Sequence, residues 1–157
     1  LIDTHIGEIV FYVRKEEHPC SLCARMRRGA LHDAAIENGC NKLALGHNFN
    51  DVVETFVMNL TIEGRLGCFS PKSYLSRKNI TLIRPLVFAP EKDIRSAARR
   101  SELPIVKSKC PADGATARQR IKLELAERDK ADRGFSERLF GALRRSGLDG
   151  WGYKQKD

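Results

Sequence analysis

Lys42-Leu43-Ala44-Leu45-Gly46-His47-Asn48-Phe49-Asn50-Asp51-Val52-Val53-Glu54-Thr55 is the stretch that decides the fold. Residues 42–46 form a short, nearly continuous apolar run, which is typical of a buried strand in a parallel sheet. Residues 50–60 place apolar side chains on one face of a helix. A strand that leads through a glycine into a helix predicts an α/β fold, in which ligands bind at the carboxyl ends of the strands.

The flanking segments continue the alternation of strands and helices. The spacing of apolar residues predicts helices over 21–38, 116–130 and 135–146, and Pro90 favours the first turn of another helix. Strands are expected over 80–83 and 104–106, and residues 64–79 are expected to form a loop. Residues 6–14 fit a strand or a helix equally well. This order indicates α/β architecture with a parallel sheet.

Composition narrows the class of protein. The 157 residues suffice for one domain, and 41% hydrophobic content disfavours disorder. The net charge is +8, and residues 91–157, with 17 basic and 11 acidic groups, carry most of it. A polyanionic partner fits this part, although a solvated helical surface explains the same charge.

No apolar run reaches the roughly 20 residues of a membrane helix. Five irregularly spaced cysteines argue against a secreted disulfide framework and favour a reducing compartment.

Three cysteines form the first group of chemical interest. Cys20 and Cys23 lie three residues apart at a helix start, where backbone N–H groups favour thiolates. Cys110 precedes a proline in a turn, a pairing that is common around iron–sulfur clusters. A zinc half-site, a redox dithiol or two core cysteines remain alternatives for the CxxC pair. Cys40 and Cys68 are expected in the core and in a loop.

Polar residues around the strand end form the second group. Gly46 leaves room for a nucleotide beside the backbone, and the following helix start favours phosphate. Asp51 could bind Mg²⁺ or act on a reacting phosphate, or Asn50 and Asp51 could simply cap the helix. Arg27 lies one helical turn after Cys23 and could reach a phosphate there, or could belong to a solvated face.

These motifs together resemble the tRNA-thiolating branch of the PP-loop ATP-pyrophosphatase superfamily. The stretch from Pro19 to Leu60, which contains CSLCARMRRGAL and KLALGHNFNDVVETFVMNL, is most similar to the tRNA 2-thiocytidine biosynthesis proteins. The resemblance continues, in the right order, through the runs IRPL (83–86), EKDI (91–94), KCPADG (109–114), RLFG (138–141) and SGLDGW (146–151).

The resemblance implies a Rossmann-like fold, similar to the adenine nucleotide alpha hydrolases, with helices on both faces of a parallel sheet. It implies three cofactors: ATP, Mg²⁺ and a 4Fe-4S cluster. Such proteins adenylate the C2 oxygen of a tRNA pyrimidine, and sulfur then replaces the activated oxygen. The implied cluster ligands are Cys20, Cys23 and Cys110. For the remaining site, the resemblance implies ATP contacts from Gly46, His47 and Arg27, catalysis by Arg27 and Asp51, and Mg²⁺ binding by Asp51.

The resemblance also implies a division of the chain. Residues 1–110 correspond to a partial PP-loop domain with the CxxC pair, and residues 111–157 to a basic helical segment on the cluster and tRNA side. The family usually has paired aspartates after GHxx, but Asn50 occupies the first position here. The sequence contains no SGGxDS phosphate loop, so we expect an N-terminally truncated enzyme that is inactive alone.

The implied partners are tRNA and a sulfur donor, either a cysteine desulfurase or sulfide, in the cytoplasm and away from membranes. Family members often form homodimers, although this sequence indicates no interface. Two alternatives remain, namely thiolation of uridine by the same chemistry and a non-catalytic metal-binding module that docks RNA. The candidate tRNA contacts are the basic residues that flank the third cysteine, Lys107, Lys109, Arg118, Arg120 and Lys122.

Overall fold

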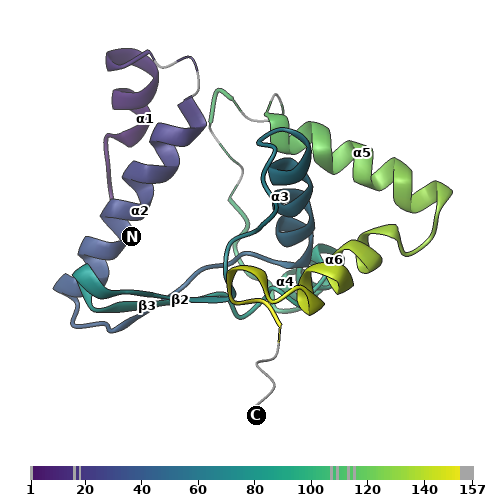
Figure 1. The fold of residues 1–157 in the computed structure, drawn as a ribbon. Coiled ribbons are helices and arrows are strands. Elements are labelled where there is room, and N and C mark those ends of the chain that lie inside the picture. The colour runs from purple at the N-terminus through teal and green to yellow at the C-terminus, as the bar shows by residue number, and fades with distance from the viewer. Residues whose placement is uncertain are drawn as a thin grey trace, which may run out of the picture.

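The computed structural model describes residues 2–15, 17, 19–106, 108, 110–112, 114 and 116–152. Its helices are α1 (Ile6–Glu8), which continues into a π-helical turn (Ile9–Val13), α2 (Pro19–Glu37), α3 (Phe49–Thr61), α4 (Glu91–Arg100), α5 (Ala117–Ala131) and α6 (Phe135–Arg145). The strands are β1 (Lys42–Ala44), β2 (Lys72–Leu75) and β3 (Ile80–Ile83). Figure 1 shows α1 and α2 on one side of the molecule and α3, α5 and α6 on the other.

The sheet has three strands in the order β1-β3-β2. β1 pairs in parallel with β3, as the alternation of strands and helices predicts, and Leu43 lies opposite Leu82. Lys42 and Ala44 are exposed and Leu43 is half-buried, so β1 is not the buried strand that its apolar run predicts, because it lies at the edge of the described sheet. β2 pairs antiparallel with β3. One face of the sheet packs against α2, where Ala35 contacts a small core that contains Ile80 and Leu82. The α/β class and the parallel pairing are therefore confirmed, with one antiparallel strand added.

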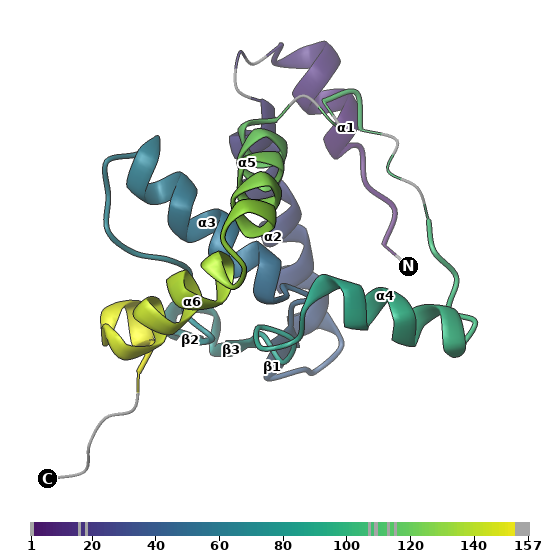
Figure 2. The ribbon, with the colours of Figure 1, turned by 90° about the vertical axis from the view of Figure 1, so that its right-hand side faces the viewer.

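The larger core lies among α3, α5 and α6, each of which packs against the other two (Figures 1 and 2). An apolar stripe at helical spacing on α3 supplies its centre, because residues three or four apart point to the same side. The buried residues of this core are Val52, Val53, Phe56, Cys68, Val87, Ile121, Leu125, Phe140, Leu143 and Trp151. The start of α3, directly after β1, is thereby held between the sheet and α5.

The segment that follows α6 packs against this core through Trp151. Trp151 is only 3% exposed, and its indole Nε1 donates a hydrogen bond to the carbonyl oxygen of Phe69 at 2.9 Å. Asp149 Oδ2 accepts a hydrogen bond from the backbone N–H of Cys68 at 2.8 Å. Gly67 permits this approach, because a Cβ there would lie 2.5 Å from that same carboxylate oxygen. The loop at 67–69 is therefore fixed against α3.

Most elements agree with the sequence-based expectations, and three do not. Residues 103–106 form no strand, and Val106 is 85% exposed, since no neighbouring strand pairs with them in the described part of the chain. β2 lies inside the segment expected as a loop. Pro90 precedes α4 with an extended backbone (ψ 143°) and does not occupy its first turn. Residues 6–13 are helical, which settles the ambiguous segment. Among the described residues, no helix is long and apolar enough to cross a membrane.

Candidate functional site

The first turn of α3 is held by a reciprocal pair of hydrogen bonds. The side chain of Asn48 accepts from the backbone N–H of Asp51 at 3.2 Å, and Asp51 Oδ2 accepts from the backbone N–H of Asn48 at 2.9 Å. This arrangement is a capping box, which satisfies N–H groups that the helix leaves unpaired. Asp51 thus has a capping role, and the Asn50 side chain is not part of the cap. The carboxylate of Asp51 lies at the helix end where negative charge is favoured.

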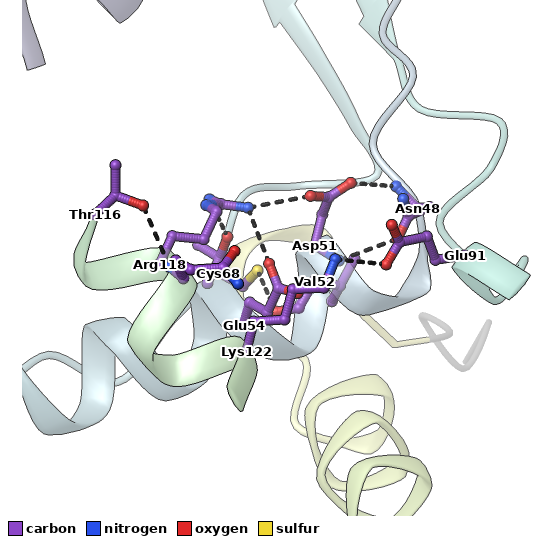
Figure 3. Close-up of polar contacts among 11 residues, drawn as sticks. Asn48, Asp51, Val52, Glu54, Cys68, Glu91, Thr116, Arg118 and Lys122 are labelled. Atoms are coloured by element: carbon purple, nitrogen blue, oxygen red, sulfur yellow. Dashed lines mark hydrogen bonds and ion pairs between the residues drawn. The ribbon is translucent and has the colours of Figure 1, made fainter. Parts of the chain in front are cut away.

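Arg118 brings α5 to this turn, as Figure 3 shows. Its guanidinium donates to Asp51 Oδ1 at 3.1 Å and to Thr55 Oγ1 at 3.0 Å. The same group lies 3.6 Å from Glu54 Oε2. One arginine from α5 therefore binds three side chains on the first two turns of α3, and the planar fork of donors suits such shared contacts.

Glu54 of α3 is a buried carboxyl group next to Arg118. The residue is only 4% exposed. Burial raises the pKa of Glu54 to about 7, and this effect outweighs the lowering by Arg118 and Lys122. A carboxyl group with such a pKa exchanges its proton near neutral pH. Glu54 is not among the residues predicted from the sequence, although its position one helical turn after Asp51 places both carboxyl groups on the same face of α3.

A second set of contacts joins the start of α4 to the same place. Lys122 of α5 forms an ion pair with Glu91 Oε2 at 2.7 Å, and Arg95 binds the other oxygen of Glu91 at 2.6 Å. The backbone N–H of Glu91 donates to Asn50 Oδ1 at 2.9 Å. Lys122 and Arg95 hold the pKa of Glu91 below its usual range. Asn50 therefore joins α3 to α4, a role that an aspartate could also perform as an acceptor.

A polar cavity of about 210 Å³ opens between these three helix ends, and its lining includes Asp51, Glu54, Glu91, Arg118 and Lys122. Its lining carries both acidic and basic side chains, as we expect of a site that binds a phosphate group together with a counter-ion. Each oxygen of Asp51 already accepts one hydrogen bond, and a carboxylate oxygen can accept a second. One acceptor position per oxygen is left for Mg²⁺, but the adjacent charge of Arg118 opposes a divalent cation there.

Gly46 and His47 lie at the carboxyl end of β1, as predicted. A Cβ added to Gly46 would meet no atom within 4 Å, so the backbone there is open to a ligand. The ring of His47 packs against Phe69 at 4.7 Å between centroids, and its buried Nδ1 has no hydrogen-bond partner among the described residues. Burial lowers the pKa of His47, with Arg84 adding to the effect. The neutral imidazole therefore dominates near pH 7.

The CxxC pair occupies the first turn of α2, with Cys20 exposed and Cys23 partly buried. Cys110 is exposed and lies outside any helix or strand. The described residues nevertheless contain no group of three ligands close enough to bind a metal ion. Two of the three predicted cluster ligands thus lie on one helix, and the structure does not bring the third together with them.

Cys68 does not belong with these thiols. It is buried, its Sγ lies 3.6 Å from the carbonyl oxygen of Val52, and burial raises its pKa to about 11. This thiol stays protonated, and it packs into the core from the loop in which the sequence placed it. Cys40 is exposed after the end of α2 and is not in the core, which corrects the expectation for that residue.

The remaining predicted site residues are separate from the polar cavity. Arg27 is exposed on α2 and lines a small cavity of about 150 Å³ with residues 2–6, so it does not share a cavity with Asp51. Arg118 and Lys122 were predicted to bind tRNA phosphates, but in the structure each forms an ion pair with a carboxylate. Arg120 is exposed, with no ion pair in the described part of the chain. Lys107 and Lys109 lie outside the described residues.

Comparisons with known proteins show to which family this chain is similar. Residues 7–129 match the PP-loop domain family. The tRNA-cytidine(32) 2-sulfurtransferase of Geobacter sulfurreducens is 38% identical over 137 residues, which cover 83% of this chain and 53% of that protein. The protein of the same name from Citrifermentans bemidjiense is 43% identical over 148 residues, which cover 82% of this chain and 58% of that protein. The chain thus spans about half the length of the curated relatives it matches.

A solved structure extends the comparison to the fold. The U34-tRNA thiolase NcsA from Methanococcus maripaludis, with its 4Fe-4S cluster, aligns with a TM-score of 0.66 and 28% sequence identity. The alignment covers 84% of this chain and 45% of that one. The α/β architecture described above is therefore similar to that of this thiolase over most of the chain.

Proposed function

This chain belongs to the PP-loop domain family, and on that premise we propose that it acts in an ATP-dependent tRNA sulfurtransferase that forms 2-thiocytidine. The observation that carries the proposal is the position of Asp51. It lies where β1 leads into α3, at the mouth of a polar cavity, and strand ends of open α/β sheets are the places where nucleotides bind. The names of the curated relatives supply the substrate class.

The proposed reaction has two displacements. The C2 oxygen of cytidine attacks the α-phosphate of ATP, and pyrophosphate leaves. A sulfur nucleophile then attacks C2, the C2–O bond breaks, and AMP leaves with the oxygen. Asp51 and Arg27 are the proposed catalytic residues, and Gly46, His47 and Arg27 are the proposed ATP contacts. Cationic groups at this edge would stabilise the charge that develops on the phosphate.

Mg²⁺ is proposed at Asp51, on the acceptor positions that its two oxygens retain. Because Arg118 opposes a cation there, ATP phosphates would have to share the ion. The open backbone at Gly46 supports a nucleotide beside the same strand end. Arg27 lines a separate cavity with residues 2–6, so its contact with the ATP phosphates stays a prediction.

Cys20, Cys23 and Cys110 are the proposed ligands of a 4Fe-4S cluster. When bound by three cysteines, such a cluster supplies one iron on which sulfur can be held. The free thiols of Cys20 and Cys23, one turn apart at a helix start, suit the first two positions. The buried, protonated Cys68 does not suit a cluster. The exposed segment of Cys110 must approach α2 to complete the set.

We further propose tRNA as the partner, with a cysteine desulfurase or sulfide as the sulfur source, and hence a cytoplasmic location. Among the predicted tRNA contacts, Arg120 has the free charge that phosphate binding requires, and Lys107 and Lys109 remain predictions. A homodimer stays a prediction with no interface assigned. The division into residues 1–110 and 111–157 stays a proposal about roles, since α5 and α6 share one core with α3.

The proposal is tested in the cell that makes the whole protein. The chromosomal gene would carry Asp51→Ala, and thionucleosides in digested bulk tRNA would be measured by mass spectrometry. We expect 2-thiocytidine to disappear while 2-thiouridine is unchanged. A matched change on an exposed face, Asp132→Ala, should leave both nucleosides at their normal amounts. Normal 2-thiocytidine with Asp51→Ala would refute the proposal.

A second candidate function is thiolation of uridine, which is favoured by the structural likeness to the U34-tRNA thiolase. Loss of 2-thiouridine in place of 2-thiocytidine would select it. A non-catalytic metal-binding module that docks RNA is the remaining alternative. It predicts that neither thionucleoside depends on Asp51, whereas RNA binding persists.

A further inference from the structure

A groove between α4 and α6 lies next to the polar cavity. Its volume is about 660 Å³, and it is lined by aromatic and basic side chains, among them Phe49, Phe88, Phe140, Lys92, Arg95 and Arg144. Asn50 and Glu91 line both the groove and the polar cavity. A molecule that lies along the groove therefore reaches the edge of the site at Asp51.

Phe88 is the feature of this groove that core packing does not explain. Its side chain is 60% exposed, although large apolar side chains nearby are buried. It makes edge contacts with Phe140 and Trp151, at 5.7 and 6.4 Å between ring centroids. These contacts hold the ring in place while leaving much of it open to solvent. A fixed, exposed ring is a platform on which a nucleobase can stack.

Basic and acidic side chains, three of each, line the groove around this ring. The guanidinium of Arg144 lies 5.9 Å from the centroid of Phe88. Within the described part of the chain, Arg144 and Lys92 have no carboxylate partner, whereas Arg95 binds Glu91. The acidic residues in the lining are Glu91, Asp129 and Glu137. Glu91 is paired with Arg95 and Lys122, and Asp129 accepts hydrogen bonds from Ser136. Glu137 has no ion pair among the described residues and keeps its negative charge on the side of α6. In a nucleic-acid strand, phosphates and bases alternate. The cations Lys92 and Arg144 could bind phosphates, and the ring of Phe88 beside Arg144 could stack with a base.

We propose that this groove binds a single-stranded RNA segment, with one base stacked on Phe88 and its phosphates against Lys92 and Arg144. The segment belongs to tRNA if the proposed function holds, and the groove then deepens that function. Single-stranded loops expose bases for stacking on aromatic side chains, which a duplex does not. Because the groove adjoins the cavity at Asp51, a strand bound there would place a neighbouring nucleotide at the site of activation.

The test compares two probes and two kinds of variant. The probes are a fluorescent twelve-nucleotide oligocytidylate and the same sequence paired in a blunt duplex, titrated with the purified chain at several salt concentrations. Phe88→Leu removes the ring and Phe88→Trp keeps an aromatic surface. Lys92→Glu and Arg144→Glu reverse the charges. Matched controls are Tyr12→Leu, an exposed ring elsewhere, and Arg77→Glu, an exposed cation after β2. Circular dichroism of every variant verifies folding.

We expect Phe88→Leu to weaken binding of the single strand about fivefold or more, and Phe88→Trp to keep it. Each charge reversal should weaken binding and lower the salt slope, by about 0.7 for each lost phosphate contact. The controls should bind as the unchanged protein does. No binding of the single strand, equal binding of the duplex, or normal binding by folded Phe88→Leu and Lys92→Glu would each overturn the proposal.

The two proposals fail in different ways. If groove variants bind RNA normally while Asp51→Ala removes 2-thiocytidine from cellular tRNA, the groove is refuted and the sulfurtransferase stands. If groove variants lose binding while thionucleosides do not depend on Asp51, the groove stands and the sulfurtransferase is refuted. Binding of the oligocytidylate requires neither ATP nor a cluster, so its result does not depend on the loading of the protein.

Discussion

Arg118 of α5 binds Asp51 of α3, with 3.1 Å between the guanidinium Nη1 and Oδ1, across 67 positions of the sequence. α5 begins shortly after the segment that contains Cys110, and α3 begins at the end of β1. The ion pair thus joins the segment of the third cysteine to the strand end proposed for ATP. It also gives Asp51 a structural role in addition to the proposed chemical one.

Replacing Arg118 should destabilise the fold. Arg118→Ala removes two hydrogen bonds and leaves the buried Glu54 without its nearest cation. We expect the free energy of unfolding to fall by about 1–2 kcal/mol, a value reduced because the Arg118 side chain is 41% exposed. Urea denaturation measures the change. Arg128→Ala, on an exposed position of the same helix, should alter the free energy by less than about 0.5 kcal/mol, and equal effects of both variants would contradict this role for Arg118.

Glu54 should make stability depend on pH in the direction opposite to a carboxylate whose pKa is lowered on folding, such as Glu91. Its pKa is about 7 in the folded protein, against an ordinary value of 4.5. Between these values the folded state binds more protons than the unfolded state, so stability falls as pH rises. The contribution is fully present below pH 4.5 and lost above pH 7, and reaches at most about 3 kcal/mol at 1.36 kcal/mol per pKa unit.

Glu54→Gln isolates this contribution, because the amide does not titrate. The free energy of unfolding of both proteins would be measured from pH 4.5 to 8. We expect the variant to gain stability relative to the unchanged protein as pH rises across this range. Asp132→Asn, an exposed carboxylate, is the control. A constant difference between Glu54→Gln and the unchanged protein would mean that folding does not shift the pKa of Glu54.

Trp151 should be one of the larger contributors to stability, despite its position after the last helix. Trp151→Ala removes a side chain that is 3% exposed and packs on Phe140, and it should cost about 3–5 kcal/mol. Trp151→Phe keeps most of the apolar area but loses the hydrogen bond to Phe69, which costs about 1 kcal/mol. Thermal and urea unfolding measure both. Similar losses for the two variants would indicate that packing contributes little.

Local sequence patterns predicted much of the fold. The stripe on α3, the apolar run of β1 and the segment 80–83 are governed by periodicity, and each element formed where it was expected. The expected strand at 104–106 did not form, because a strand requires a partner and periodicity does not reveal one. β2 was missed for the converse reason. Its pairing with β3 stabilises a segment whose glycines and proline indicate a loop.

The candidate site was predicted in part. Gly46, His47 and Asp51 lie together because they follow one strand. The contacts of Arg118 with Asp51 and of Lys122 with Glu91 join segments far apart in the sequence, so charge alone could not assign these residues to carboxylates or to tRNA. The burial of Glu54 and the exposure of Phe88 likewise depend on how α5 and α6 pack. The roles assigned to the three cysteines stay predictions.

The central claim is that Cys20, Cys23 and Cys110 together hold an iron–sulfur cluster for sulfur transfer. Its most direct test is the iron, acid-labile sulfide and zinc content of anaerobically purified protein, compared with Cys110→Ser and with Cys40→Ser as the matched control. The account predicts about four irons and four sulfides per chain, retained in Cys40→Ser and lost or destabilised in Cys110→Ser. Zinc alone, free thiols without metal, or an unaffected cluster in Cys110→Ser would contradict it.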